Sequence, residues 1–253
     1  MAWPWHRTLV PMAAWVLAGA VLGREPFDYF ANSWSVVGLR DYVHGARITP
    51  ANEVMLAGKA KLSIRFGNRL TPLSRRQTKT CLDGWLPVIL VSAQDGDVRY
   101  DFTFWATPLP SVKDWRKAFD WPTEGENFLV WVLAKAVNTG QQTAQARLEA
   151  ACGGRGRKWS FAWSLDPGRS AEAVLRVPYA PVREPAAFDR EDPKVWLERT
   201  VAYWRGLMAK AARITVPCRK ATEALLAAHV CQLIANDHGE LQGGEGFYDN
   251  FYI

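Results

Sequence analysis

The chain has 253 residues, of which 49% are hydrophobic and 22% are charged, and its formal net charge is +6. This composition is typical of a globular protein with one large domain, or with one domain and part of a second. Nucleic-acid binding favours a basic face with interleaved aromatic rings, whereas this charge is spread along the chain, with short clusters only at 75–76 and 155–158. We therefore expect these clusters to be solvated loop tips, and we expect no nucleic-acid partner.

Residues 1–23 have the features of a secretory signal peptide. His6 and Arg7 precede an apolar run at 9–22, and Ala18-Gly19-Ala20 supplies small residues at the spacing that a signal peptidase reads. The run is shorter than the ~20 residues of a membrane-spanning helix, and Pro11 interrupts it. We expect an exported protein, periplasmic or extracellular, with no stable membrane insertion after cleavage. An uncleaved N-terminal anchor remains the alternative.

Residues 24–182 are predicted to form an antiparallel β-sandwich. Apolar and polar residues alternate in Lys61–Phe66 and again in Val98–Phe104, as in strands with one buried face. Gln94-Asp95-Gly96-Asp97 predicts a hairpin between a strand at 85–92 and the Val98 strand, because Asp-Gly between apolar runs is a strong turn signal. Short strands separated by turn residues favour a sandwich over a parallel sheet. Further strands are predicted at 128–137, 143–151, 158–165 and 172–179.

The cysteines and histidines indicate neither a metal site nor a cofactor. Cys218 and Cys231 fall on one predicted helix, where a rise of ~1.5 Å per residue separates them by about 20 Å, too far for a disulfide. Cys81 and Cys152 could pair in an oxidising compartment, and the sequence leaves that pairing undetermined. The four histidines show no metal-ligand spacing, and no CxxC or HExxH motif occurs.

A linker helix is predicted within 183–215. Asp192 is suited to cap its start and Pro193 to occupy its first turn, and apolar residues then recur at steps of three and four from Trp196 to Ala211. This spacing predicts a helix that packs along one side.

A short strand at 213–216 and a second helix that ends near Asn236 follow. Between Ala224 and Ala235 only His229 and Gln232 are polar, so we expect this helix to be buried against other helices, which the chain does not supply. His229 and Gln232 are expected to form a hydrogen-bonded core pair, and a pair that faces a site is the alternative.

The order of these elements resembles the front of the six-hairpin glycosidases, which are the glucoamylase-like and rhamnosidase-like enzymes. The segments that carry the resemblance are Asp83-Gly84-Trp85-Leu86-Pro87, Tyr100-Asp101-Phe102, Val195-Trp196 to Tyr203-Trp204, Val216-Pro217 and Gly243-Gly244-Glu245-Gly246 with 247–253. The resemblance implies a mainly β fold with C-terminal helices: an N-terminal sandwich, a linker helix and an (α/α)6 barrel. Residues 216–253 would start that barrel, and the chain would be truncated at Ile253, before the remaining barrel helices.

The same resemblance implies a carbohydrate site in the aromatic segment after the second helix. The expected contacts are Phe247, Tyr248, Asp249, Phe251 and Tyr252, because aromatic rings stack on pyranose faces and carboxylates or phenols hydrogen-bond sugar hydroxyls. The alternative is that the rings cap the helix end and that Asp249 is a turn residue. The 13 tryptophans leave a similar choice between sugar stacking and core filling.

No catalytic residue follows from the sequence. Glycoside hydrolysis generally needs two carboxyl groups ~5 to 9.5 Å apart, and the resemblance places them on later barrel loops. We expect the N-terminal fragment of an exported glycoside hydrolase-like protein, inverting in its full-length parent and inactive by itself. A non-catalytic exported carbohydrate-binding or envelope-associated sandwich protein is the alternative.

Overall fold

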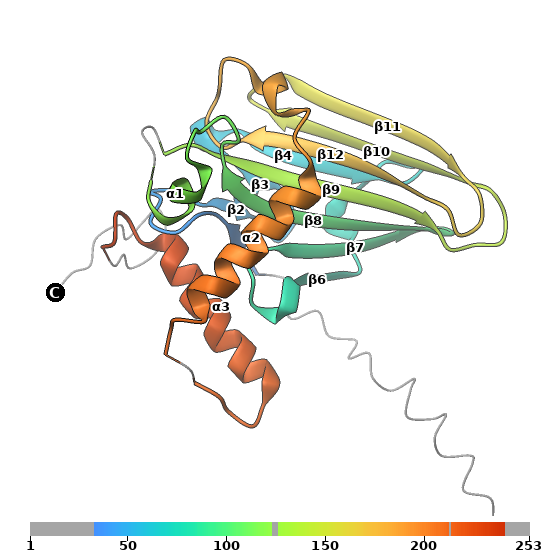
Figure 1. Cartoon of the computed structure of the whole chain (residues 1–253). Coiled ribbons are helices and arrows are strands. Elements are labelled where there is room, and N and C mark those ends of the chain that lie inside the picture. The colour runs from blue at the N-terminus through green and yellow to red at the C-terminus, as the bar shows by residue number, and fades with distance from the viewer. Residues whose placement is uncertain (1–32, 123–125, 213, 241–253) are drawn as a thin grey trace, which may run out of the picture.

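The computed structural model describes residues 33–122, 126–212 and 214–240 and has the expected fold class, mainly β with two C-terminal α-helices (Figure 1). The seven-stranded sheet has the order β1-β2-β3-β4-β10-β11, with β5 paired to β4, and the five-stranded sheet has the order β12-β9-β8-β7-β6. All pairings are antiparallel. The strands are β1 (Ser35–Val37), β2 (Ala46–Ile48), β3 (Val54–Met55), β4 (Lys61–Phe66), β5 (Thr71–Pro72), β6 (Thr78–Cys81), β7 (Ile89–Asp95), β8 (Val98–Pro108), β9 (Phe128–Asn138), β10 (Ala144–Gly153), β11 (Arg157–Leu165) and β12 (Ser170–Pro178).

The helices are short except for the last two. The 3-10 turns are η2 (Ala57–Lys59), η3 (Leu73–Arg75), η4 (Leu82–Gly84) and η5 (Pro185–Phe188), and the α-helices are α1 (Trp115–Asp120), α2 (Pro193–Met208) and α3 (Arg219–Ala235). In the described part of the chain no helix is both long and apolar enough to cross a bilayer.

The predicted hairpin is confirmed. Asp95 of β7 pairs with Val98 of β8, so Gly96 and Asp97 form a two-residue turn, and Gly96 takes a positive φ of 55° there. The first strand of this hairpin lies further along the chain than predicted, at Ile89–Asp95 instead of 85–92. The chain turns before it at η4, where Asp83 also has a positive φ.

The core lies between the inward faces of the two sheets. The alternation predicted from the sequence places Phe66, Tyr100, Phe102 and Phe104 inside, each at most 1% exposed. The Tyr100 hydroxyl accepts a hydrogen bond from the backbone N–H of Arg147 at 3.2 Å, which joins the two sheets across the core.

Helix α2 covers the outer face of the five-stranded sheet (Figure 1). Trp196, Thr200 and Trp204 are buried at steps of four residues, as predicted for a helix packed along one side. Beneath them Trp105 and Trp131 stack with ring centroids 5.6 Å apart and an interplanar angle of 5°. These four tryptophans belong to the core and are not exposed for sugar stacking.

The predicted start of α2 is also confirmed. The Asp192 carboxylate accepts a hydrogen bond from the backbone N–H of Lys194 at 2.8 Å, and Pro193 occupies the first helical position. The cap leaves one fewer unpaired N–H at the helix start.

Helix α3 departs from the prediction. Only Val230 and Ile234 are buried, and Leu225 is 37% exposed, so among the described residues the helix is not covered all round. It contacts the sandwich along a narrow stripe, where the Leu233 carbonyl accepts from the backbone N–H of Asp41 at 3.1 Å. The predicted strand before α3 is absent at 214–216.

Two smaller expectations are also corrected. Arg155 is half-buried and not a solvated loop tip, because its guanidinium donates to the carbonyls of Ala57, Pro178 and Tyr179. His229 and Gln232 are both exposed, and the Gln232 side chain donates to Asn236 Oδ1 at 3.2 Å instead of forming a core pair with His229. All four cysteines are free.

Candidate functional site

The five predicted sugar contacts, Phe247, Tyr248, Asp249, Phe251 and Tyr252, lie outside the described residues. The structure therefore neither brings them together nor separates them. Two features next to α3 have functional chemistry: a polar cluster at its C-terminal end and a pocket between α2, α3 and η4.

The polar cluster consists of Glu126, Asp237 and His238. The His238 Nε2 atom lies 2.9 Å from a Glu126 carboxylate oxygen, and Nδ1 lies 2.5 Å from Asp237 Oδ1. The other Glu126 oxygen accepts from the backbone N–H of Val43 at 2.8 Å. The imidazole is thus held between two carboxylates, one from the chain before β9 and one from the end of α3.

The backbone strengthens this anchor. His238 takes a positive φ of 49° and its N–H donates to the Asp41 carbonyl at 3.2 Å, while Asp237 and Glu240 form an isolated β-bridge. The Trp121 ring, 49% exposed, lies edge-on to the imidazole with centroids 6.1 Å apart. The end of α3 is therefore fixed to the sandwich by side chains and main chain together.

A second layer of polar groups lies behind the cluster. Asp41 is 3% exposed, and its carboxylate pairs with Arg40 Nε at 2.7 Å, while Arg40 also donates to the Asp120 carbonyl. Burial, with a smaller contribution from Asp120, raises the pKa of the Tyr203 phenol on α2. Asp41 Oδ1 has no hydrogen-bond partner within the described ranges.

Glu126, Asp237 and His238 also offer three ligand atoms that lie within 4.8 Å of one another. The sequence search missed this group, because Glu126 is far from the other two along the chain and no spacing motif joins them. The only sequence signal was Asp237-His238 directly after the apolar helix. In the structure both imidazole nitrogens already contact a carboxylate, so the ring is held in place by the two acidic side chains themselves.

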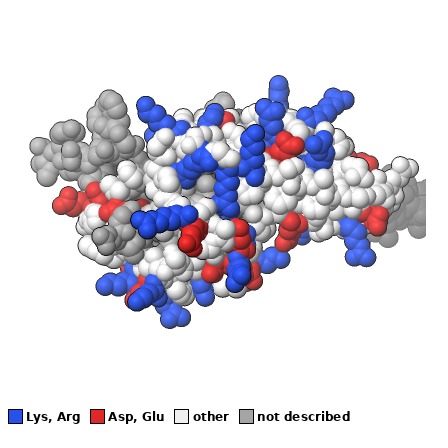
Figure 2. Space-filling view, turned by 90° about the horizontal axis from the view of Figure 1, so that it is seen from above, with Lys and Arg blue, Asp and Glu red and all other residues white. Residues whose placement is uncertain are grey.

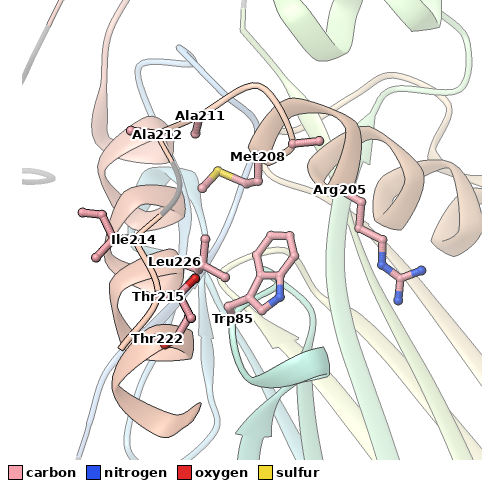
Figure 3. A pocket seen from close by; sticks show the side chains of 10 residues that line it. Trp85, Arg205, Met208, Ala211, Ala212, Ile214, Thr215, Thr222 and Leu226 are labelled. Carbon is pink, nitrogen blue, oxygen red and sulfur yellow. The ribbon is translucent and has the colours of Figure 1, made fainter. Parts of the chain in front are cut away.

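The pocket has a volume of about 640 Å³ and lies between the end of α2, the start of α3 and η4 (Figure 3). Trp85 lies in its middle, with Met208 and Leu226 on one side and Arg205 on the other (Figure 3). Thr215 and Thr222 add hydroxyl groups to the lining. The volume is in the ~300–1,000 Å³ range of small-molecule sites.

The turn before Trp85 positions its indole. Asp83 and Gly84 both take left-handed conformations, with φ of 55° and 78°, which reverses the chain between β6 and β7. A Cβ on Gly84 would lie 2.6 Å from Glu223 Cδ and closer still to its Oε2, so any other residue would push the Glu223 side chain aside, and the positive φ also favours glycine here. Buried Leu86 follows at once and fixes the end of the turn.

The charges at the pocket are paired. Arg205 contacts the Asp83 carboxylate at 2.5 Å, and Arg219 contacts the Glu223 carboxylate at 2.5 Å. Of these four residues Arg205 is the one that lines the pocket, and its charge is offset by Asp83 in the turn before Trp85. On the face seen in Figure 2, Lys and Arg side chains are likewise dispersed, with Asp and Glu between them.

A second, smaller pocket of about 350 Å³ lies near Cys152, Arg155 and Pro178. The Arg155 guanidinium that lines it is already used to bind backbone carbonyls. We therefore assign it a structural role.

Comparison of the chain with protein-family models, with curated proteins and with solved structures finds no match.

Proposed function

We propose that the chain recognises carbohydrate, as the sandwich-and-helix part of an exported glycoside hydrolase-like protein. The observation that carries this proposal is the anchored end of α3. Contacts from Glu126 and Asp41 fix Asp237 and His238 to the sandwich directly before the glycine-rich aromatic segment. A binding segment loses less conformational entropy on binding when its base is held in advance.

The order of the elements supports the same proposal. A sandwich, a helix packed on its outer face and a second helix occur in the order of the six-hairpin glycosidases that the sequence resembles. Helix α3 keeps exposed apolar residues, among them Leu225 and Ala228, and such a surface suits packing against further helices of an (α/α)6 barrel.

We assign no catalytic residue. Asp83 is paired with Arg205, which lines the pocket, and Glu223 is paired with Arg219 at the start of α3. Glycoside hydrolysis generally needs two carboxyl groups that face the scissile bond, whereas each of these two faces a guanidinium. This pairing favours the second candidate function, carbohydrate binding without hydrolysis by the residues described.

Affinity electrophoresis of the chain without residues 1–23 tests the proposal. We expect retardation by at least one neutral polysaccharide, and its loss in Tyr248→Ala and Phe247→Ala. Trp34→Ala is the matched control, because Trp34 is an aromatic residue directly before β1 and is 57% exposed. A reducing-sugar assay on the same samples separates hydrolysis from binding. A chain that migrates equally with and without every polysaccharide would rule the proposal out.

A further inference from the structure

We infer that the pocket around Trp85 is a binding subsite for a neutral hexopyranose. This inference rests on the proposed carbohydrate function and adds a second place of contact, separate from the aromatic segment at 247–252. Three observations carry it: the aromatic platform, the turn that holds it, and the ion pair between Arg205 of the pocket lining and Asp83.

The Trp85 indole provides the platform. It is half-buried, and it lies within the cavity with Met208 and Leu226 beside it (Figure 3). A pyranose ring has an apolar face of C–H groups, which packs on an indole while the hydroxyls at its edge point outwards. Buried tryptophans fill the core, whereas this one reaches a solvent-open pocket.

The turn that presents Trp85 has a tightly defined backbone. Asp83 is not glycine and still keeps a φ of 55°, and Gly84 at 78° packs directly against the Glu223 side chain. Aspartate, like asparagine, adopts the left-handed conformation more readily than most other residues, so the turn has a defined backbone that places Trp85 beside α3. The Asp83 carboxylate contacts Arg205, which lines the pocket.

The rim chemistry selects the class of sugar. Arg205 supplies N–H donors and Asp83 supplies acceptors at one side of the indole, and both side chains are partly exposed, at 57% and 40%. Vicinal hydroxyls of a sugar both donate and accept, so they match such a pair. Because the pair has no net charge, a neutral hexose fits better than a uronic acid, whose carboxylate would meet Asp83.

Saturation-transfer-difference NMR on the chain without residues 1–23 tests this inference. The probes are D-glucose, D-galactose, D-mannose and L-rhamnose, with D-galacturonic acid as the charged comparison. We expect transfer to the ring protons of at least one neutral sugar. We expect at least a tenfold weaker affinity in Trp85→Ala, a change within about threefold in Trp85→Phe, which keeps a stacking ring, and no change in Trp34→Ala.

A second variant keeps the test informative if Trp85→Ala does not fold. Asn tolerates the left-handed conformation, so Asp83→Asn keeps the turn and leaves Arg205 without its carboxylate partner. We expect this variant to bind D-galacturonic acid at least threefold more tightly than the wild type does.

The outcomes separate this inference from the proposed function. Loss of the signals in Tyr248→Ala, with full retention in Trp85→Ala and no gain in Asp83→Asn, would overturn the Trp85 subsite and leave the carbohydrate function intact. Absence of transfer from every neutral sugar, together with unretarded migration on polysaccharides, would overturn both. Signals that depend on Trp85 and on Asp83 as stated would support the subsite.

Discussion

Gly38→Ala is a direct test of how α3 is attached to the sandwich. A Cβ on Gly38 would lie 2.7 Å from Cγ2 of Ile234 and 3.3 Å from Cα of Gly45. Carbon atoms pack best at about 3.5–4.0 Å, so the new methyl group overlaps the helix by about 1 Å. Both neighbours are hard to move, because one is a branched side chain on a helix and the other is backbone.

The expected cost follows from two opposing terms. An extra methyl group in a packed site costs about 1–3 kcal/mol, while replacing glycine restricts the unfolded chain and returns about 0.4–1 kcal/mol. We expect Gly38→Ala to lower the free energy of unfolding by about 1–2 kcal/mol. We also expect faster hydrogen exchange in residues 226–236, because α3 is pushed from its contact.

A control and a rescue sharpen the test. Gly206→Ala lies in α2 with nothing within 4 Å of the new Cβ, and we expect it to stabilise the protein by up to about 1 kcal/mol. Ile234→Leu removes Cγ2 at similar volume, so it should cost less than about 1.5 kcal/mol alone and recover part of the loss in Gly38→Ala. Urea unfolding measures the stabilities. If Gly38→Ala unfolds like the wild type and the exchange of α3 is unchanged, the docking described here is refuted.

Three further predictions use other features. Asp192→Ala should cost about 1 kcal/mol in urea unfolding through loss of the α2 cap, whereas Asp192→Asn should cost little. Burial raises the pKa of the Cys81 thiol to about 11, so alkylation there should stay slow up to about pH 10 by mass spectrometry. Burial favours the protonated thiol. The free energy of unfolding therefore includes a contribution of about 2–3 kcal/mol from Cys81 that is fully present below about pH 8.5 and is lost as the pH rises through 11. Gly84→Ala should cost more than Gly168→Ala, since both have positive φ but only the first meets Glu223; equal losses in thermal unfolding would contradict this contact.

Local patterns predicted most of the sandwich. Alternation in Lys61–Phe66, the hairpin turn within 94–97 and the Asp192-Pro193 cap depend on neighbouring residues, and each appears in the structure. The turn residues are Gly96 and Asp97, one position after the Asp-Gly pair itself. The sequence did not predict that α2 packs on the outer face of the five-stranded sheet. It shows which side of a helix is apolar but not which surface that side contacts.

The features next to α3 could not be predicted for the same reason. Glu126 and His238 are far apart in the sequence and come into contact only in the folded chain, so no residue spacing predicts the contact. The apolar run of α3 predicted burial, yet the part of the chain described here covers only the stripe at Val230 and Ile234. The Trp85 pocket combines the turn at η4 with two helices more than a hundred residues later in the chain. No local sequence pattern can show that these segments come together.

The sheet topology also favours one order of folding over others. Strands β6 to β9 follow one another in the five-stranded sheet, so their pairings close short loops. In the seven-stranded sheet β4 pairs with β10, and Phe66 lies opposite Leu148, a contact between distant parts of the chain. Pairings of such long sequence separation slow folding towards the millisecond-to-second range. The meander of the smaller sheet should therefore form first and serve as the surface on which the larger sheet is completed.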